Sequence, residues 1–237
     1  MIEINQLYKS FGKLEVLKDI NLDLKSSECI ALIGPNGCGK TTLIKSILGM
    51  VIPTTGTIKV KEQLITKNFE YRKNIGYMPQ IGRYPDNMSV GQIVEMIKDI
   101  RSSHETLDED LLNEFKLKSI FNKQMRTLSG GTTQKVSATL AFLFNPDILI
   151  LDEPTAGLDP LASEILKEKI VSEKQKGKLI MITSHLLSEL DDLITQLIFM
   201  QEGCVEFHKT IAELQTSTGE EKISKAIAHV LKQKNNE

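Results

Sequence analysis

A glycine-rich loop between an apolar run and a helical pattern constrains this chain more than any other feature. Residues Gly34–Thr41 read GPNGCGKT and fit G-x-x-x-x-G-K-[ST] without a gap. In a chain of this length and average composition, that pattern arises by chance roughly 0.01 times. The apolar run Cys29–Ile33 precedes the loop, and Thr41–Leu48 follows it as a predicted helix that Gly49 and Pro53 end. Strand, glycine loop and helix in this order begin a parallel α/β unit.

The residue types in the loop suit phosphate binding. Glycines let successive backbone N–H groups turn towards phosphate oxygens, and the N-terminus of the helix adds partial positive charge. Lys40 supplies a full positive charge for the β- and γ-phosphates, and the Thr41 hydroxyl can bind Mg²⁺. The sequence therefore predicts a nucleoside triphosphate site rather than an ordinary glycine turn.

An acidic pair follows a second predicted strand. The strand Asp147–Leu151 leads directly into Asp152 and Glu153. Asp152 is expected at the edge of the parallel sheet, where it would hold Mg²⁺ through water, and Glu153 would orient or deprotonate the attacking water. An acidic pair after a strand is weak evidence alone, so this prediction depends on the phosphate loop in the same chain.

The remaining patterns divide the chain into an α/β part and a helical insertion. Alternating apolar residues before the loop, such as Ile2 and Ile4, predict half-buried strands. Residues Asp86–Met125 have helical spacing, so we expect an inserted helical lobe. The α/β pattern then returns with a helix over Pro160–Gly177 and a strand over Lys178–Thr183.

The C-terminal part contains a turn and one more amphipathic segment. Glu202-Gly203 is a turn signal between two short strands. From Gly219 onward, apolar residues recur at helical spacing. This tail is interpreted as a small helix packed on the domain or, alternatively, as a docking element for a partner.

Composition excludes several classes of protein. The 237 residues are 41% hydrophobic and 25% charged, with a net charge of -2, which argues against a disordered chain and a dedicated nucleic-acid binder. Three scattered cysteines, Cys29, Cys38 and Cys204, show no spacing typical of zinc sites or disulfides. No signal peptide is recognisable, and no apolar run approaches the roughly 18 residues needed to span a bilayer. We expect a cytoplasmic protein that reaches a membrane only through a partner.

A second candidate anion site begins another predicted helix. In Leu128–Gly131 (LSGG), Ser129 is a natural N-cap, and Gly130 and Gly131 expose backbone N–H groups. A monomer needs only one such site for one γ-phosphate. The economical inference is that this second site completes the nucleotide pocket of another subunit.

With these motifs in this order, nearly the whole chain resembles the ATP-binding subunit of an ABC transporter. The resemblance implies an α/β fold: a P-loop NTPase with a RecA-like parallel-sheet core, an N-terminal antiparallel β subdomain and an inserted α-helical subdomain. Residues 1–237 would form a single ABC ATPase domain. Its core would comprise residues 1–85 and 136–215, its helical signature subdomain residues 86–135, and its tail residues 216–237.

The resemblance also assigns roles residue by residue. Phe11 resembles the aromatic that stacks on adenine, with Tyr8 as a rival; Gln80 resembles the glutamine that contacts Mg²⁺ and signals to the membrane partner; His185 resembles the histidine that contacts the γ-phosphate. The implied catalytic residues are Lys40, Gln80, Glu153 and His185. The implied ATP-binding residues are Phe11, Gly34, Pro35, Asn36, Gly37, Cys38, Gly39, Lys40, Thr41, Thr42, Ser129, Gly130, Gly131 and Asp159, and the implied Mg²⁺ ligands are Thr41, Gln80 and Asp152.

By the same resemblance, two chains would close head to tail over two ATP molecules and power a separate membrane permease from its cytoplasmic face. Residues Gln80–Ser89, including Tyr84 and Pro85, would form the groove for a cytoplasmic helix of that permease. One departure from the family pattern is Thr132, which replaces the glutamine that usually ends the LSGGQ motif. This departure puts in doubt a glutamine contact at the dimer interface.

Other phosphate-loop proteins fit less well. A small GTPase needs N-K-x-D, and the nearest run, Asn122–Met125, lacks the aspartate. A nucleotide kinase has no use for LSGG, and too few residues separate Gln80 from Ser129 for the coiled coil of a DNA-repair relative. The remaining alternative is a soluble ABC ATPase that drives an assembly scaffold, for example for iron–sulfur clusters.

Among transporters, the chain looks more like efflux and ABC-2 subunits, and residues 80–101 also resemble ATPases of nitrous-oxide reductase copper maturation.

Overall fold

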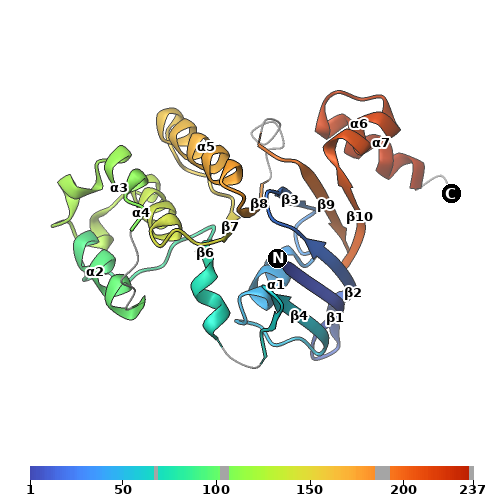
Figure 1. Cartoon of the computed structure of the whole chain (residues 1–237), viewed down its shortest axis with the longest axis horizontal. Coiled ribbons are helices and arrows are strands. Elements are labelled where there is room, and N and C mark those ends of the chain that lie inside the picture. Colours follow the sequence, from blue (N-terminus) through green and yellow to red (C-terminus); the bar gives the residue numbers. More distant parts are fainter. Residues whose placement is uncertain (67–68, 102–106, 185–192, 235–237) are drawn as a thin grey trace. The chain divides into compact units, whose positions relative to one another are not determined.

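The chain folds into two compact units that are connected twice. The computed structural model describes residues 1–66, 69–101, 107–184 and 193–234 (Figure 1). One unit is formed by the two ends of the sequence, Met1–Tyr71 and Met181–Glu237, and is called the outer unit. The other is formed by the middle of the sequence, Arg72–Ile180, and is called the middle unit. Within the described residues, no helix is long and apolar enough to cross a membrane.

The outer unit contains an antiparallel sheet and a group of three paired strands. The antiparallel sheet has the strand order β2-β1-β4-β5, and in the second group β9 pairs in parallel with β3 and antiparallel with β10 (Figure 1). The strands are β1 (Ile2–Phe11), β2 (Leu14–Leu24), β3 (Cys29–Ile33), β4 (Thr55–Val60), β5 (Gln63–Leu64), β9 (Gln196–Gln201) and β10 (Cys204–Thr210). The helices are α1 (Lys40–Ile47), α6 (Ile211–Thr218) and α7 (Ile223–Lys234).

Local sequence explains most of these elements. All five residues of β3 are buried, as expected of a strand that is covered on both faces. Glu202 and Gly203 both have positive φ and form the predicted turn between β9 and β10. A capping box between Thr210 and Glu213 begins α6, and Gly219 ends it in the left-handed conformation. The predicted C-terminal helix is confirmed as α7, which packs against α6.

The middle unit pairs two parallel strands and contains most of the helices that the described residues form. Strands β6 and β7 are parallel, with Ile75 opposite Ile148 and Met78 opposite Leu151. Strand β8 (Leu179–Thr183), buried at every position, leads the chain back to the outer unit. The other elements are η1 (Glu70–Asn74), β6 (Ile75–Met78), α2 (Val90–Arg101), α3 (Asp110–Glu114), η2 (Leu117–Ile120), η3 (Met125–Thr127), α4 (Gly130–Phe142), β7 (Ile148–Asp152) and α5 (Pro160–Gln175).

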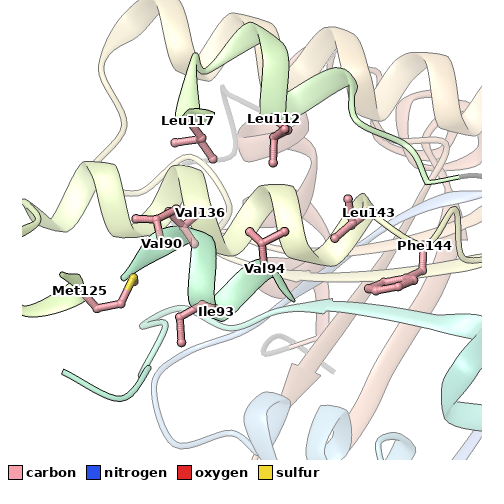
Figure 2. Close-up of a cluster of buried hydrophobic side chains, with 9 residues drawn as sticks. All are labelled: Val90, Ile93, Val94, Leu112, Leu117, Met125, Val136, Leu143 and Phe144. Atoms are coloured by element: carbon pink, nitrogen blue, oxygen red, sulfur yellow. The ribbon is translucent and has the colours of Figure 1, made fainter. Parts of the chain in front are cut away.

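The predicted helical region has its own apolar core. Residues Val90, Ile93 and Val94 lie at i, i+3 and i+4 on α2, so they share one face of the helix. Figure 2 shows this face gathered with side chains of α4 and of the segments between the two helices. The other members of the cluster are Leu112, Leu117, Met125, Val136, Leu143 and Phe144.

A buried ion network anchors α5 within the middle unit. Lys169 and Glu173, one helical turn apart on α5, have side chains that are 6% and 0% exposed. Lys169 Nζ lies 2.6 Å from carboxylate oxygens of both Asp108 and Asp110 and 3.0 Å from Glu173 Oε1. Glu173 Oε2 pairs with the buried Lys178. The sequence patterns gave no sign of this network, because its members are polar residues from separate segments.

The network predicts an acid-sensitive contribution to stability. Burial by itself raises the pKa of Glu173, but hydrogen bonds from Lys176, Lys178 and Lys169 outweigh burial and hold this pKa at about 2, below the ordinary 4.5. A lowered pKa stabilises the fold above the unfolded-state value, and this stability disappears as pH falls from about 4.5 to about 2. The difference corresponds to about 3 kcal/mol.

Urea unfolding at several pH values tests this contribution. Glu173→Gln should lower the free energy of unfolding at pH 7 by about 3 kcal/mol, since the buried Lys169 and Lys178 lose a negatively charged partner. The same variant should also flatten the fall in stability below pH 4.5. The matched control is Glu164→Gln, which removes an exposed ion pair with Lys167 on the same helix. Equal effects of the two substitutions would contradict the prediction.

Candidate functional site

The phosphate loop joins β3 to α1 in the outer unit. Gly37 and Gly39 have φ of 81° and 107°, values that favour glycine. Gly39 is the N-cap of α1, and it has no side chain that could accept a hydrogen bond from the first N–H groups of the helix. Pro35, Asn36 and Gly37 are exposed, whereas Cys38 is buried. This geometry suits an anionic ligand at the helix N-terminus.

The back of the loop is closed by backbone groups of the outer unit. A Cβ atom at Gly34 would collide with the carbonyl oxygen of Met200, and one at Gly39 would lie 2.8 Å from the carbonyl oxygen of Val16. Gly203 donates its N–H to the Cys38 carbonyl at 3.2 Å. The turn at Gly203 therefore supports the loop, a role that its turn signal alone did not reveal.

Lys40 lies across the loop at the start of α1. Its ammonium donates to the carbonyl oxygens of Gly34 and Pro35, at 2.7 and 3.1 Å. The charge thus sits at the loop, beside the exposed Thr41. Thr42, next in the helix, is half-buried.

The predicted adenine-stacking residue lies at the end of β1. The Phe11 side chain is 51% exposed, and Lys9 Nζ lies 4.7 Å from the centre of its ring. Its rival Tyr8 is 39% exposed on the same strand. Both rings are therefore accessible, and the choice of Phe11 stays a prediction.

The acidic pair lies where β7 ends in the middle unit. Asp152 is the last residue of β7 and is 9% exposed, and Glu153 follows with φ of 51°. Tyr77 lies on β6, the strand paired with β7. Burial and the negative charge of Asp152 together raise the pKa of Tyr77 to about 12. Mg²⁺ in phosphate sites is usually held by one or two carboxylates plus phosphate oxygens, and a buried carboxylate at a strand end fits that requirement. Gln80 is exposed just after β6.

The LSGG motif begins α4 as predicted. Ser129 is its N-cap, and the Ser129 Oγ accepts a bond from the Thr132 N–H at 3.3 Å. The two hydroxyls of Ser129 and Thr132 also lie 2.9 Å apart. Thr132, in place of the usual glutamine, is thus hydrogen-bonded within its own motif. Gly130 is exposed and Gly131 is half-buried, so the helix N-terminus is open to a ligand.

Asp159 begins α5. Its Oδ1 accepts the Ala162 N–H at 2.9 Å, and its Oδ2 lies 2.6 Å from Lys135 Nζ on α4. The hydrogen bond from Lys135, followed by that from Ala162, lowers the pKa of Asp159. The sequence did not predict the capping role or the contact with Lys135.

An open pocket in the middle unit lies at the segment that follows Gln80 in the sequence. It has a volume of about 510 Å³ and is lined by Gly82–Asp86 together with Met125 and Thr133. Tyr84 donates its hydroxyl to Ser137 Oγ at 3.0 Å or accepts from it, which fixes one wall. This pocket lies in the segment predicted to form a groove for a partner helix, and is called the 82–86 groove below.

The described residues do not include every predicted site residue. His185 lies outside them. The phosphate loop and Phe11 belong to the outer unit, whereas Gln80, Asp152, Glu153, Asp159 and the LSGG motif belong to the middle unit.

Curated proteins with similar sequences are ATP-binding proteins of transporters. The chain is 32% identical over 228 residues to the uncharacterized ABC transporter ATP-binding protein YhaQ of Bacillus subtilis, covering 94% of this chain and 76% of that protein. It is 34% identical to the lantibiotic transport ATP-binding protein SrtF of Streptococcus pyogenes, covering 88% and 90%. It is 31% identical to the Nod factor export ATP-binding protein I of Burkholderia lata, covering 85% and 68%.

Solved structures confirm the predicted fold. An ATP-binding subunit of an ABC transporter aligns with a TM-score of 0.90 at 27% identity, covering 98% of this chain and 99% of that one. An ATP-binding cassette solved as a dimer with ADP and Pi aligns with a TM-score of 0.78 at 23% identity, covering 89% and 99%. The family model described as ABC transporter matches residues 17–156. The chain therefore belongs to the ABC transporter family, as an ATP-binding and ATP-hydrolysing subunit.

Proposed function

We propose that this chain is the head-to-tail dimeric motor of an exporter, and that it powers a separate membrane permease. The observation that carries the proposal is the presence of two separate helix N-termini, which begin at Gly39 and at Ser129, together with the 82–86 groove. Each helix start offers backbone N–H groups to a phosphate. One chain thus supplies both kinds of surface that an ATP-bridged dimer needs.

Within one site, the phosphate loop residues would bind the triphosphate through backbone N–H groups and Lys40. Thr41, Gln80 and Asp152 would hold Mg²⁺, which supplies charge neutralisation at the phosphates when it is bound. Phe11 would stack on the adenine. Lys40 needs to turn only from the Gly34 and Pro35 carbonyl oxygens to reach a phosphate oxygen.

Glu153 would orient and deprotonate the attacking water, and His185 would contact the transferring phosphoryl group. The support for Glu153 is its place directly after Asp152, the last residue of β7. Ser129, Gly130, Gly131 and Asp159 would complete the site of the partner chain.

The membrane partner would dock in the 82–86 groove. Ile81 directly precedes Gly82, the first residue that lines this groove, and is 69% exposed. Its apolar side chain could therefore contact a partner helix. The named relatives serve lantibiotic transport and Nod factor export, which favours an exporter working at the cytoplasmic face of the membrane. The alternative is a soluble ATPase that drives an assembly scaffold, and the identity of the docked partner separates the two.

Substitution of the proposed catalytic carboxylate tests the chemistry. Glu153→Gln should keep ATP binding and lower the single-turnover rate of hydrolysis by about 10²-fold or more, because the amide cannot accept the proton of the water. Unchanged hydrolysis would remove Glu153 from the proposed role.

The support of the phosphate loop can be tested at Gly203. Gly203→Ala places a Cβ 2.8 Å from the Val16 carbonyl oxygen and strains the bond to Cys38, so ATP affinity should weaken about tenfold. Gly219→Ala is the matched control, since Gly219 also has positive φ but has open space around its Cβ position. Titration with a fluorescent ATP analogue measures both. Equal affinities of the two variants would show that the turn does not support the loop.

Partner capture tests the docking surface. Tagged Glu153→Gln protein, extracted from membranes with detergent, should co-purify a multi-span membrane protein. Adding Ile81→Asp should reduce the captured amount, whereas Ile100→Asp, at an isoleucine with 71% exposure on α2, should not. A soluble partner, with the chain absent from membranes, would instead support the assembly-scaffold ATPase.

A further inference from the structure

One face of α4 contacts the turn that carries the proposed catalytic carboxylate. Gly131, Gln134 and Lys135 lie at i, i+3 and i+4, so they share a face of the helix. All three touch the segment Glu153–Asp159, called the acid turn below, and both partners lie in the middle unit. Ser129, the N-cap of the same helix, precedes this face directly.

The three contacts differ in chemistry but act on successive parts of the acid turn. A Cβ at Gly131 would lie 2.5 Å from the Gly157 carbonyl oxygen, so the backbones meet without room for a side chain. The buried amide of Gln134 donates to the Glu153 carbonyl oxygen at 3.4 Å. Lys135 Nζ lies 2.6 Å from Asp159 Oδ2.

The contact at Glu153 acts where the backbone is strained. Glu153 has φ of 51°, a left-handed conformation that costs a non-glycine residue free energy unless its surroundings hold it. Its carbonyl oxygen accepts from the Ala156 N–H at 3.1 Å as well as from Gln134. Because Gln134 is buried on a helix, its bond connects the peptide group of Glu153 to α4.

The contact at Asp159 fixes the other end of the turn. Asp159 divides its two oxygens between the N-terminus of α5, through Ala162, and Lys135 on α4. The acid turn is therefore held at its first and last residues by neighbouring side chains of one helix.

We propose that Gln134 and Lys135 are positioning residues that set the orientation of Glu153 from α4. This proposal rests on the proposed function, in which the N-terminus of α4 serves the ATP of the partner chain while Glu153 serves its own. The face of α4 then links phosphate contact at one ATP site to carboxylate position at the other. A shift of α4 would then act on both, because the backbone of Gly131 packs against the Gly157 carbonyl oxygen without room for a side chain.

Double-substitution kinetics test the link. Lys135→Met keeps the bulk of the side chain without its charge, and Asp159→Asn keeps an oxygen that can cap α5. Each should lower kcat for ATP by roughly tenfold with KM within about twofold, since small misplacements of a catalytic group can cost up to about 10²-fold. The double variant should be no slower than either single variant, and Lys135→Arg should restore most of kcat because it re-forms the ion pair.

Gln134→Leu should likewise lower kcat more than KM, because it removes the donor to Glu153 and keeps an apolar side chain in a buried place. The matched control is Lys167→Met, which breaks the exposed pair with Glu164 on α5 and should leave kcat unchanged. Melting temperatures of all variants accompany the kinetics. Additive losses in the double variant, a change in KM alone, or no rescue by Lys135→Arg would overturn the proposal.

The proposal and the function on which it rests fail in different ways. If Glu153→Gln hydrolyses ATP like the unsubstituted chain, the proposed role of Glu153 fails first. If Glu153→Gln is inactive while Lys135→Met and Gln134→Leu keep full kcat, only the positioning by α4 fails.

Discussion

The conformation of the phosphate loop depends on the protein backbone that packs against it, on the side opposite to the one where a phosphate would bind. Backbone N–H groups can face a phosphate only if the opposite side of the same peptides packs tightly against protein. Here the packing partners are the carbonyl oxygens of Met200 and Val16, which leave no room for a Cβ at Gly34 or Gly39. The glycines are thus required twice, by the backbone angles of the loop and by the strands behind it.

The middle unit meets a related demand at the carboxyl end of β7. Strand β7 ends at Asp152, and the next residue, Glu153, has a left-handed backbone conformation. Gln134 and Lys135 of α4 contact the acid turn at Glu153 and Asp159, and these contacts help to stabilise its backbone conformation. In the proposed dimer, the N-terminus of the same helix would contact the ATP of the partner chain. Helix α4 would then both support the turn at Glu153 and link the two ATP sites.

The sequence predicted the elements whose signals are local. The run Cys29–Ile33 is β3 at the expected bounds, Ser129 begins its helix as predicted, and the α/β fold with an antiparallel N-terminal sheet is confirmed. Pro160 at the start of α5 reflects its fixed φ, which suits the first helical position. Such signals extend over only a few residues. The structure agrees with them because the backbone preferences that cause them depend on neighbouring residues and not on the rest of the fold.

Long-range support escaped prediction for a physical reason. Gly203 was predicted only as a turn glycine, although its N–H donates to the Cys38 carbonyl oxygen. No sequence pattern pointed to Lys169 and Glu173, which are buried in an ion network. The sequence by itself determined the family, the ATP chemistry and the order of the motifs, because glycine spacing, caps and apolar runs act locally. Only the tertiary structure decided which residues hold those motifs in place, since a hydrogen bond or ion pair between distant segments leaves no periodic trace in the chain.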